Sequence, residues 1–174
     1  AYKRCLDLQR RRGIALTSFK WVQPNLAIEH ADVATIKGNS FTVSTYSYAK
    51  KPYFQTNNPA VISLPWQERK NFEVCRYNFV WLGSTGFVHK GLDLVLEAFT
   101  EMPDHHLTVC GPISREKDFA KAFHKELYET ANIHTYGWID VGSREFIDLA
   151  NRCIGIVYPS CAEGQAGSVI NCLQ

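Results

Sequence analysis

The sequence predicts an α/β protein in which a parallel sheet carries helices on both faces. In the second half of the chain, short apolar runs alternate four times with helical patterns. Glycine or proline closes each apolar run. Repeated strand–helix units of this kind build a parallel sheet, because each crossover helix returns the chain to the same end of the sheet. Hydrophobic residues make up 45% of the 174 residues and charged residues 21%, which is ordinary for a globular protein with a core.

Four short runs rich in β-branched and aromatic residues are the expected buried strands. They are residues 79–82, 106–110, 133–136 and 153–158. The residues that follow them are Gly83, Gly111, Gly137 and Pro159. In parallel α/β sheets, ligands bind at the carboxyl ends of the strands. The candidate chemistry therefore gathers on one rim of the sheet.

Helical spacing of apolar residues links these strands. The expected helices are residues 91–100, 116–129, 143–152 and a last one that starts at about Ser168. Leu92, Val95, Leu96 and Phe99 form one face of the first helix. Ser143 is a suitable N-cap for the third.

The first 57 residues show a weaker pattern. A helix is expected over 2–12 with Gly13 as its stop, and 15–22 fits either a strand or an apolar turn. The remaining expected elements are a short helix over 26–31, a strand over 33–37, a helix over 40–49 and a strand over 53–56. The last three form a small βαβ unit. Prolines and a polar run mark 58–71 as a linker, so the expected domains are 1–57 and 72–174.

Charge and cysteine usage narrow the function classes. A net charge of +2 is too small to indicate nucleic-acid binding, and the cluster Arg10–Arg12 fits a solvated face or a phosphate or lipid contact. The six cysteines are scattered without a CxxC pair, which favours a reduced, cytoplasmic compartment. We see no signal-peptide pattern and no apolar run of membrane-spanning length in these 174 residues, so neither feature is expected from them. Because Ala1 is no natural start and Gln174 falls within a helical pattern, we expect a piece of a longer protein.

One candidate site follows the last expected strand. Residues 159–171 lead from that strand through small residues into a helix. Gly164, Ala166 and Gly167 let the backbone approach a ligand, and the first N–H groups of the helix can bind an anion. Glu163 stands beside this point, where its carboxylate can accept hydrogen bonds from sugar hydroxyls.

A second candidate site follows the strand 79–82. The segment from Gly83 to Gly91 has neither the Gly-Lys-Ser/Thr order of a Walker loop nor the glycine spacing of a dinucleotide site. Lys90 precedes an expected helix. A cation is unfavourable there by roughly 0.3–1 kcal/mol, so its presence favours a bound anion.

These two segments resemble the motifs of the family 4 (group 1) glycosyltransferases. Glu163 matches the family's first acidic residue, and Lys90-Gly91 matches its Lys-Gly pair. Asn171 stands eight positions after Glu163, where the family carries a second acidic residue, and Ser84 stands where it carries arginine. The resemblance covers about residues 72–174; residues 1–71 resemble the end of the amino-terminal lobe only by the order of their elements.

The resemblance implies a GT-B type protein with a Rossmann-like donor lobe over 72–174, incomplete here, and the end of an acceptor lobe over 1–57. It implies transfer, with retention, of a sugar from a nucleoside-diphosphate sugar to a glycan or lipid-linked acceptor. No metal or other cofactor is required, and nucleic acid is not a partner. A cytoplasmic location follows, with peripheral contact to the inner membrane face as an option.

The resemblance also assigns roles to residues. Lys90 and Glu163 would be catalytic, Trp138 and Ile139 would adjoin the base, and Asn171 would face the ribose. The full expected donor site is Gly83, Ser84, Lys90, Gly91, Gly111, Trp138, Ile139, Glu163, Gly164, Gln165, Ala166, Gly167, Ser168 and Asn171.

The sequence also leaves other functions open. Because Ser84 and Asn171 replace charged family residues, a nucleotide-sugar-binding module without turnover is one alternative, and a GT-B epimerase or phosphorylase is another. His124-x-Glu126 matches half of a zinc deaminase motif, but the cysteine pair is missing, so no metal site is expected. No Gly-x-Ser-x-Gly elbow indicates a hydrolase.

Overall fold

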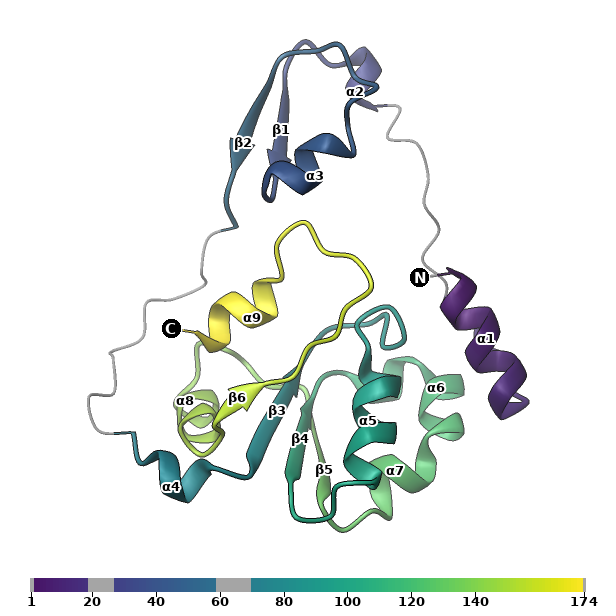
Figure 1. The fold of residues 1–174 in the computed structure, drawn as a ribbon, viewed down its shortest axis with the longest axis vertical. Coiled ribbons are helices and arrows are strands. Elements are labelled where there is room, and N and C mark those ends of the chain that lie inside the picture. The colour runs from purple at the N-terminus through teal and green to yellow at the C-terminus, as the bar shows by residue number, and fades with distance from the viewer. Residues whose placement is uncertain (1, 19–26, 59–69, 174) are drawn as a thin grey trace.

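The computed structural model describes residues 2–18, 27–58 and 70–173, which form a smaller unit above a larger one in Figure 1. The elements in chain order are α1 (Tyr2–Arg12), α2 (Ala27–His30), β1 (Ala34–Lys37), α3 (Ser40–Ser44), β2 (Tyr53–Thr56), α4 (Phe72–Cys75), β3 (Asn78–Leu82), α5 (Leu92–Thr100), β4 (His106–Cys110), a 3-10 turn (Ile113–Arg115), α6 (Lys117–Ala122), α7 (His124–Tyr128), β5 (Ile133–Gly137), α8 (Arg144–Asn151), β6 (Gly155–Ile156) and α9 (Gly167–Cys172). The smaller unit is residues 27–58 and the larger is 70–173.

The larger unit contains the parallel sheet that the sequence predicts. Its strand order is β5-β4-β3-β6, and every pair of neighbours is parallel. The last strand is shorter than the expected 153–158, because only Gly155 and Ile156 pair in register with β3. The Val157 N–H still donates to the Val80 carbonyl at 2.9 Å, which carries the chain on toward the rim.

Helices cover both faces of this sheet, as expected. Side chains alternate along β3, so Trp81 faces one core while Val80 and Leu82 face another. The Trp81 core includes buried residues of α5, α6 and α7, and the opposite core includes Phe146 and Leu149 of α8. This two-sided burial explains why the strands read as nearly continuous apolar runs.

Two local features differ from the expectation. The helix expected over 116–129 is interrupted at Phe123, which leaves helical geometry at φ −112° and ψ 27°. The Phe123 ring is fully buried, stacks on Phe119 at 4.6 Å and lies under the Arg12 guanidinium, so tertiary packing overrides the helical pattern. The short helix α4 was not expected; Asn71 caps it by accepting from the N–H groups of Glu73 and Val74. Most of the expected linker, 59–69, lies outside the described residues.

The smaller unit is the expected βαβ unit. Strands β1 and β2 pair in parallel from Ala34↔Tyr53 to Lys37↔Thr56. The helix between them starts at Ser40 as expected, where the Asn39 side chain caps it. It is shorter than expected because turns follow Ser44. The segment 15–22, left undecided from the sequence, has no helix or strand over 15–18, and its residues 19–22 lie outside the described part, as does Leu26.

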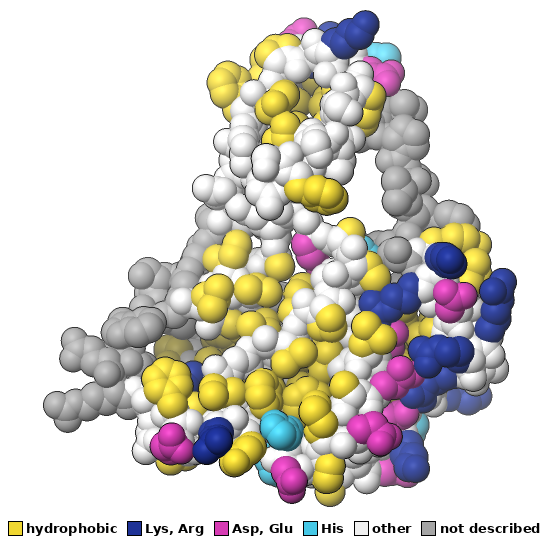
Figure 2. Space-filling view, in the orientation of Figure 1, with side chains coloured by type: hydrophobic (Ala, Val, Ile, Leu, Met, Phe, Trp, Pro, Cys, Tyr) yellow, Lys and Arg dark blue, Asp and Glu magenta, His cyan; other side chains and the backbone are white. Residues whose placement is uncertain are grey.

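Helix α1 packs on the larger unit. Its Cys5 and Leu8, with Leu16 beyond it, join the Trp81 core. Arg12 pairs with Glu97 of α5 at 3.1 Å and with Glu126 of α7 at 2.8 Å. Residues 2–18, which we expected with the amino-terminal lobe, therefore contact α5 and α7. Figure 2 shows basic and acidic side chains gathered on the side where α1 lies.

The segment between β6 and α9 rises toward the smaller unit (Figure 1). We call residues 157–166 the signature loop. The Gln165 carbonyl accepts from the Asn58 side-chain amide at 2.9 Å, and the Gln165 side-chain amide donates to Asn57 Oδ1 at 2.8 Å. Gly164 lies against the Lys37 carbonyl, which a Cβ at position 164 would meet at 2.8 Å. The signature loop thus contacts the smaller unit as well as its own sheet.

Candidate functional site

A cavity of about 230 Å³ lies where β3, β4 and β5 end, beside α9. We call it the rim cavity. It is lined by Leu82, Gly83, Ser84, Cys110, Gly111, Trp138, Ile139, Asp140, Val141, Ser168 and Asn171. The structure therefore brings together Gly83, Ser84, Gly111, Trp138, Ile139, Ser168 and Asn171, all of which the sequence placed in one donor site. Leu82, Cys110, Asp140 and Val141 were not in the expected donor site, although each stands next to an expected residue or one position beyond it.

The walls of the rim cavity differ in character. Gly83 and Gly111 are buried and pack on each other, since a Cβ at Gly111 would meet the Gly83 carbonyl at 2.5 Å. Ile139 is 4% exposed and belongs to the core, whereas Trp138 is 69% exposed. Ser168 and Asn171 come from α9 on the opposite wall. The cavity thus combines apolar and glycine residues from the strand ends with polar side chains, among them Ser168 and Asn171 of α9.

The Lys90 segment reaches the rim beside the signature loop. Gly91 adopts a left-handed φ of 78° and caps α5, and a Cβ there would meet the Pro159 carbonyl at 2.3 Å. Lys90 donates from Nζ to the Thr85 carbonyl at 2.7 Å, which holds its ammonium over the loop that contains Ser84. The Lys90 carbonyl accepts from the Trp81 indole at 3.3 Å. The two segments singled out in the sequence therefore meet, although Lys90 and Gly91 do not line the rim cavity itself.

Glu163 is held by hydroxyl groups of its own loop. Its Oε1 accepts from Tyr158 at 3.1 Å and from Ser160 at 3.0 Å. Burial, together with the neighbouring Glu163 carboxylate, raises the pKa of Tyr158, so its hydroxyl stays protonated and donates to that carboxylate. Glu163 is exposed, and its second oxygen can still accept hydrogen bonds from a ligand.

A second cavity of about 580 Å³ lies between the signature loop and the smaller unit. We call it the inter-unit cavity. Its lining is Thr35, Ile36, Lys37, Phe41, Thr42, Thr45, Tyr46, Cys161, Ala162, Glu163 and Gly164. Glu163 therefore faces a cleft with several hydroxyl side chains. Sequence reasoning did not assign these hydroxyl residues to a site, because only the tertiary contact between β1, α3 and the signature loop brings them near Glu163.

The remaining predicted residues have contacts of other kinds. Gln165 binds Asn57 and Asn58 with its side-chain amide. Ala166 is the N-cap residue of α9. Gly167 is the first residue of that helix, and a Cβ there would have nothing within 4 Å. Gly164 approaches the backbone of Lys37. Of the small residues that we expected to admit a ligand, Gly164 therefore admits the backbone of the smaller unit.

Two kinds of feature are absent from the described residues. No group of three or more His, Cys, Asp or Glu side chains is arranged to hold a metal ion in residues 2–18, 27–58 and 70–173. In the same ranges, no helix is both long and apolar enough to cross a bilayer.

The sequence was also compared with known proteins. Neither protein-family models nor curated proteins give a match to this chain. The function that the chain can perform therefore follows from the geometry of the rim, the two cavities and the chemistry of the side chains that line them.

Proposed function

We propose that this chain binds a nucleoside-diphosphate sugar at the rim and forms the donor site of a retaining glycosyltransferase of GT-B type. The observation that carries the proposal is the rim cavity, in which residues from four separate segments of the sequence converge where the parallel strands end. Its volume of about 230 Å³ suits one end of a nucleotide. The rest of the donor would extend along the signature loop toward Glu163.

The proposed orientation follows from the two walls. The base would lie against Ile139 and the glycine backbone at the apolar end, and the ribose hydroxyls would bond to the Asn171 amide. The diphosphate would lie near Ser84 and the start of α9, within reach of the Lys90 ammonium. The sugar would then approach Glu163 at the mouth of the inter-unit cavity, where threonine and tyrosine hydroxyls line the opposite wall. The acceptor would enter from that cavity.

The chemistry requires stabilisation of the departing diphosphate. Lys90 and backbone N–H groups would bind the negative charge that develops there, and groups already oriented in the ground state cost no reorganisation during the reaction. Glu163, fixed by Tyr158 and Ser160, would orient the sugar through its hydroxyls. No metal is needed for either step.

Two substitutions test the proposal. Affinity would be measured calorimetrically for UDP, GDP and ADP and for their glucose conjugates. Lys90→Ala should weaken the affinity for diphosphate and sugar conjugate alike, by about tenfold or more, because a charge-assisted hydrogen bond contributes about 1.5–3 kcal/mol. Glu163→Gln should leave the nucleoside diphosphate unchanged and weaken only the sugar conjugate.

Matched controls are available on exposed surface. Lys117→Ala removes an exposed lysine at the start of α6, and Glu101→Gln alters an exposed carboxylate at the far end of α5 from Lys90. Neither should change any affinity. Wild-type affinities for both site variants, or no binding of any of the six ligands by the wild-type chain, would refute the proposed function.

Binding without transfer is a second candidate. Ser84 and Asn171 line the rim cavity as uncharged residues, so this cavity could hold a nucleotide without strongly stabilising the charge of a leaving diphosphate. Donor hydrolysis or transfer, measured beside the affinities, separates the two functions: tight binding with no turnover in the complete protein would favour the binding module.

A further inference from the structure

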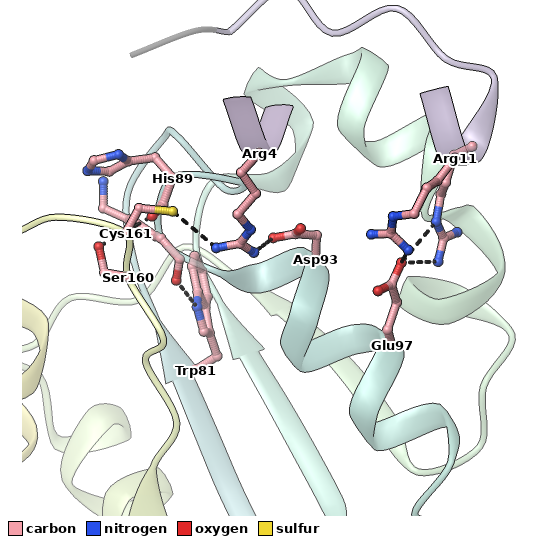
Figure 3. Close-up of polar contacts among 10 residues, drawn as sticks. Arg4, Arg11, Trp81, His89, Asp93, Glu97, Ser160 and Cys161 are labelled. Carbon is pink, nitrogen blue, oxygen red and sulfur yellow. Dashed lines mark hydrogen bonds and ion pairs between the residues drawn. The ribbon is translucent and has the colours of Figure 1, made fainter. Parts of the chain in front are cut away.

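Arg4 of α1 joins two segments of the candidate site that are far apart in the sequence (Figure 3). Its Nη2 pairs with Asp93 Oδ1 in the first turn of α5, and its Nη1 lies 3.1 Å from Cys161 Sγ in the signature loop. The side chain of Arg4 is 24% exposed, and that of Asp93 only 1%. One guanidinium thus uses both arms of its fork, a geometry that lysine cannot reproduce.

The two segments that Arg4 joins carry the proposed phosphate and sugar contacts. Asp93 follows Lys90 by three residues, and Cys161 precedes Glu163 by two. The same segments also meet directly, since the Cys161 N–H donates to the His89 carbonyl at 2.8 Å. Figure 3 shows Cys161 between His89 on one side and Arg4 on the other.

The Asp93 carboxylate depends on this contact. Burial raises the pKa of Asp93, and the hydrogen bond and charge of Arg4 act in the opposite direction. Its other oxygen, Oδ2, is buried and has no hydrogen-bond partner among the described residues. The N–H groups of Leu94 and of Asp93 itself also support this carboxylate, and Arg4 supplies the opposite charge. A buried charge is stable only with its counter-charge in place, so Asp93 holds the guanidinium where its second arm reaches Cys161.

We propose that Arg4 is a positioning residue that holds the signature loop, and with it Glu163, in place against the start of α5. The inference rests on the proposed function, in which Glu163 orients the donor sugar. Arg4 acts through Cys161 and Asp93 and touches no ligand itself. Helix α1 is then a support for the donor site.

Arg4→Lys is the first test, since it keeps a cation beside Asp93 but removes the second arm toward Cys161. The loss of one hydrogen bond should weaken the affinity for the nucleotide–glucose conjugate by roughly three- to tenfold. The nucleotide used is the one that the wild-type chain binds. The affinity for the matching nucleoside diphosphate should stay within about twofold of wild type. Amide hydrogen exchange of 161–164 should accelerate by a similar three- to tenfold.

Arg11→Lys is the matched control, because Arg11 pairs with Glu97 of the same helix α5 at 3.4 Å and, among the described residues, makes no hydrogen bond or ion pair with the signature loop. It should change neither affinity nor exchange. The paired variant Arg4→Met/Asp93→Leu removes both charges together and so avoids leaving the buried carboxylate alone. In that background, Cys161→Ala should have no further effect on exchange, although it accelerates exchange in the wild type.

The outcomes separate this inference from the proposed function. If the wild-type chain binds no nucleotide sugar, the proposed function fails, while the exchange measurements still decide whether Arg4 holds the loop. If the wild type binds but Arg4→Lys matches Arg11→Lys in both affinity and exchange, the positioning role is overturned. A loss of sugar affinity with accelerated exchange at 161–164, found for Arg4→Lys alone, supports it.

Discussion

The backbone N–H of Cys161 donates a 2.8 Å hydrogen bond to the carbonyl oxygen of His89. The Ser160 hydroxyl adds a contact of 3.3 Å to the same oxygen. These bonds join the signature loop to the segment that precedes α5, so Lys90 and Glu163 are carried by backbone segments in direct contact. Any displacement of one segment must therefore strain or break its bonds to the other.

Gly91→Ala should destabilise the protein by about 2 kcal/mol or more. Gly91 has a positive φ of 78°, which costs a residue with a side chain roughly 1–2 kcal/mol. In addition, the new Cβ would lie 2.3 Å from the Pro159 carbonyl, so the two segments must separate. Urea unfolding measures the loss, and hydrogen exchange at 159–163 should accelerate.

Gly155→Ala is the control for this substitution. Gly155 lies in β6 of the same sheet, and a Cβ there would have nothing within 4 Å. Its effect on the free energy of unfolding should stay within about 0.5 kcal/mol. Equal losses of unfolding free energy in the two alanine variants would show that neither the contact with Pro159 nor the left-handed geometry requires glycine at position 91.

Asn132→Ala should cost about 2–3 kcal/mol of the free energy of unfolding. Asn132 is 6% exposed, and its side-chain amide caps the C-terminal end of α5. It donates to the carbonyl of Phe99, within α5, at 2.9 Å and to those of Met102 and His105, beyond the helix, at 3.0 and 2.7 Å. Its loss leaves buried acceptors without this donor, and each such group costs about 1–3 kcal/mol. Thr130→Ala, which removes one exposed bond to the Lys125 carbonyl, should cost much less. Similar losses for both would contradict the capping role of Asn132.

The sheet of the larger unit was predictable because its strands are buried on both faces. Trp81 and Val80 face opposite cores, so both must be apolar, and the run is visible without any knowledge of partners. The break at Phe123 was not predictable, since local spacing continues through it and only the stacked Phe119 ring and Arg12 reveal its cause.

The candidate site was predictable in part for a related reason. Strand ends fall on one rim in any parallel sheet, so Gly83, Gly111 and Trp138 could be grouped from the sequence. The inter-unit cavity could not be predicted, because Thr42 and Glu163 are brought together by tertiary contacts such as that of Gly164 with Lys37. The role of Arg4 depends in the same way on the packing of α1, which local sequence does not specify.

Gln165→Ala should loosen the contact between the units without weakening the larger unit. It removes the bonds that the Gln165 side chain makes to Asn57 Oδ1 and to the Asn58 N–H. The Asn58 N–H should then exchange faster, while the urea midpoint of the larger unit stays unchanged. Gln55→Ala is a useful contrast, because Gln55 donates to the Gly38 carbonyl within the smaller unit. Faster exchange of Asn58 in the Gln55 variant alone would refute this account of the contact.

The stability of the chain should fall steeply above about pH 9, because of buried thiols. Burial, with smaller contributions from neighbouring thiols, raises the pKa of Cys110 to about 12. Burial also raises the pKa of Cys153 to about 11. A free thiol ionises near pH 8.5. Below that pH the thiol is protonated in both the folded and the unfolded chain, so its contribution to the stability of the fold is complete. As pH rises further, only the unfolded chain ionises, and each thiol removes up to about 1.4 kcal/mol per pH unit until its folded pKa is reached.

Cys110→Ala isolates this effect. The variant should be less stable than wild type at pH 7, and its deficit should shrink by up to about 1.4 kcal/mol per unit between pH 9 and pH 11, since alanine has no proton to lose. Val109→Ala, at the neighbouring fully buried position of β4, provides the control. Its deficit should remain constant across the same range, because neither valine nor alanine titrates. Urea unfolding at pH 7, 9, 10 and 11 measures both series, and parallel deficits for the two variants would show that ionisation of Cys110 does not limit alkaline stability.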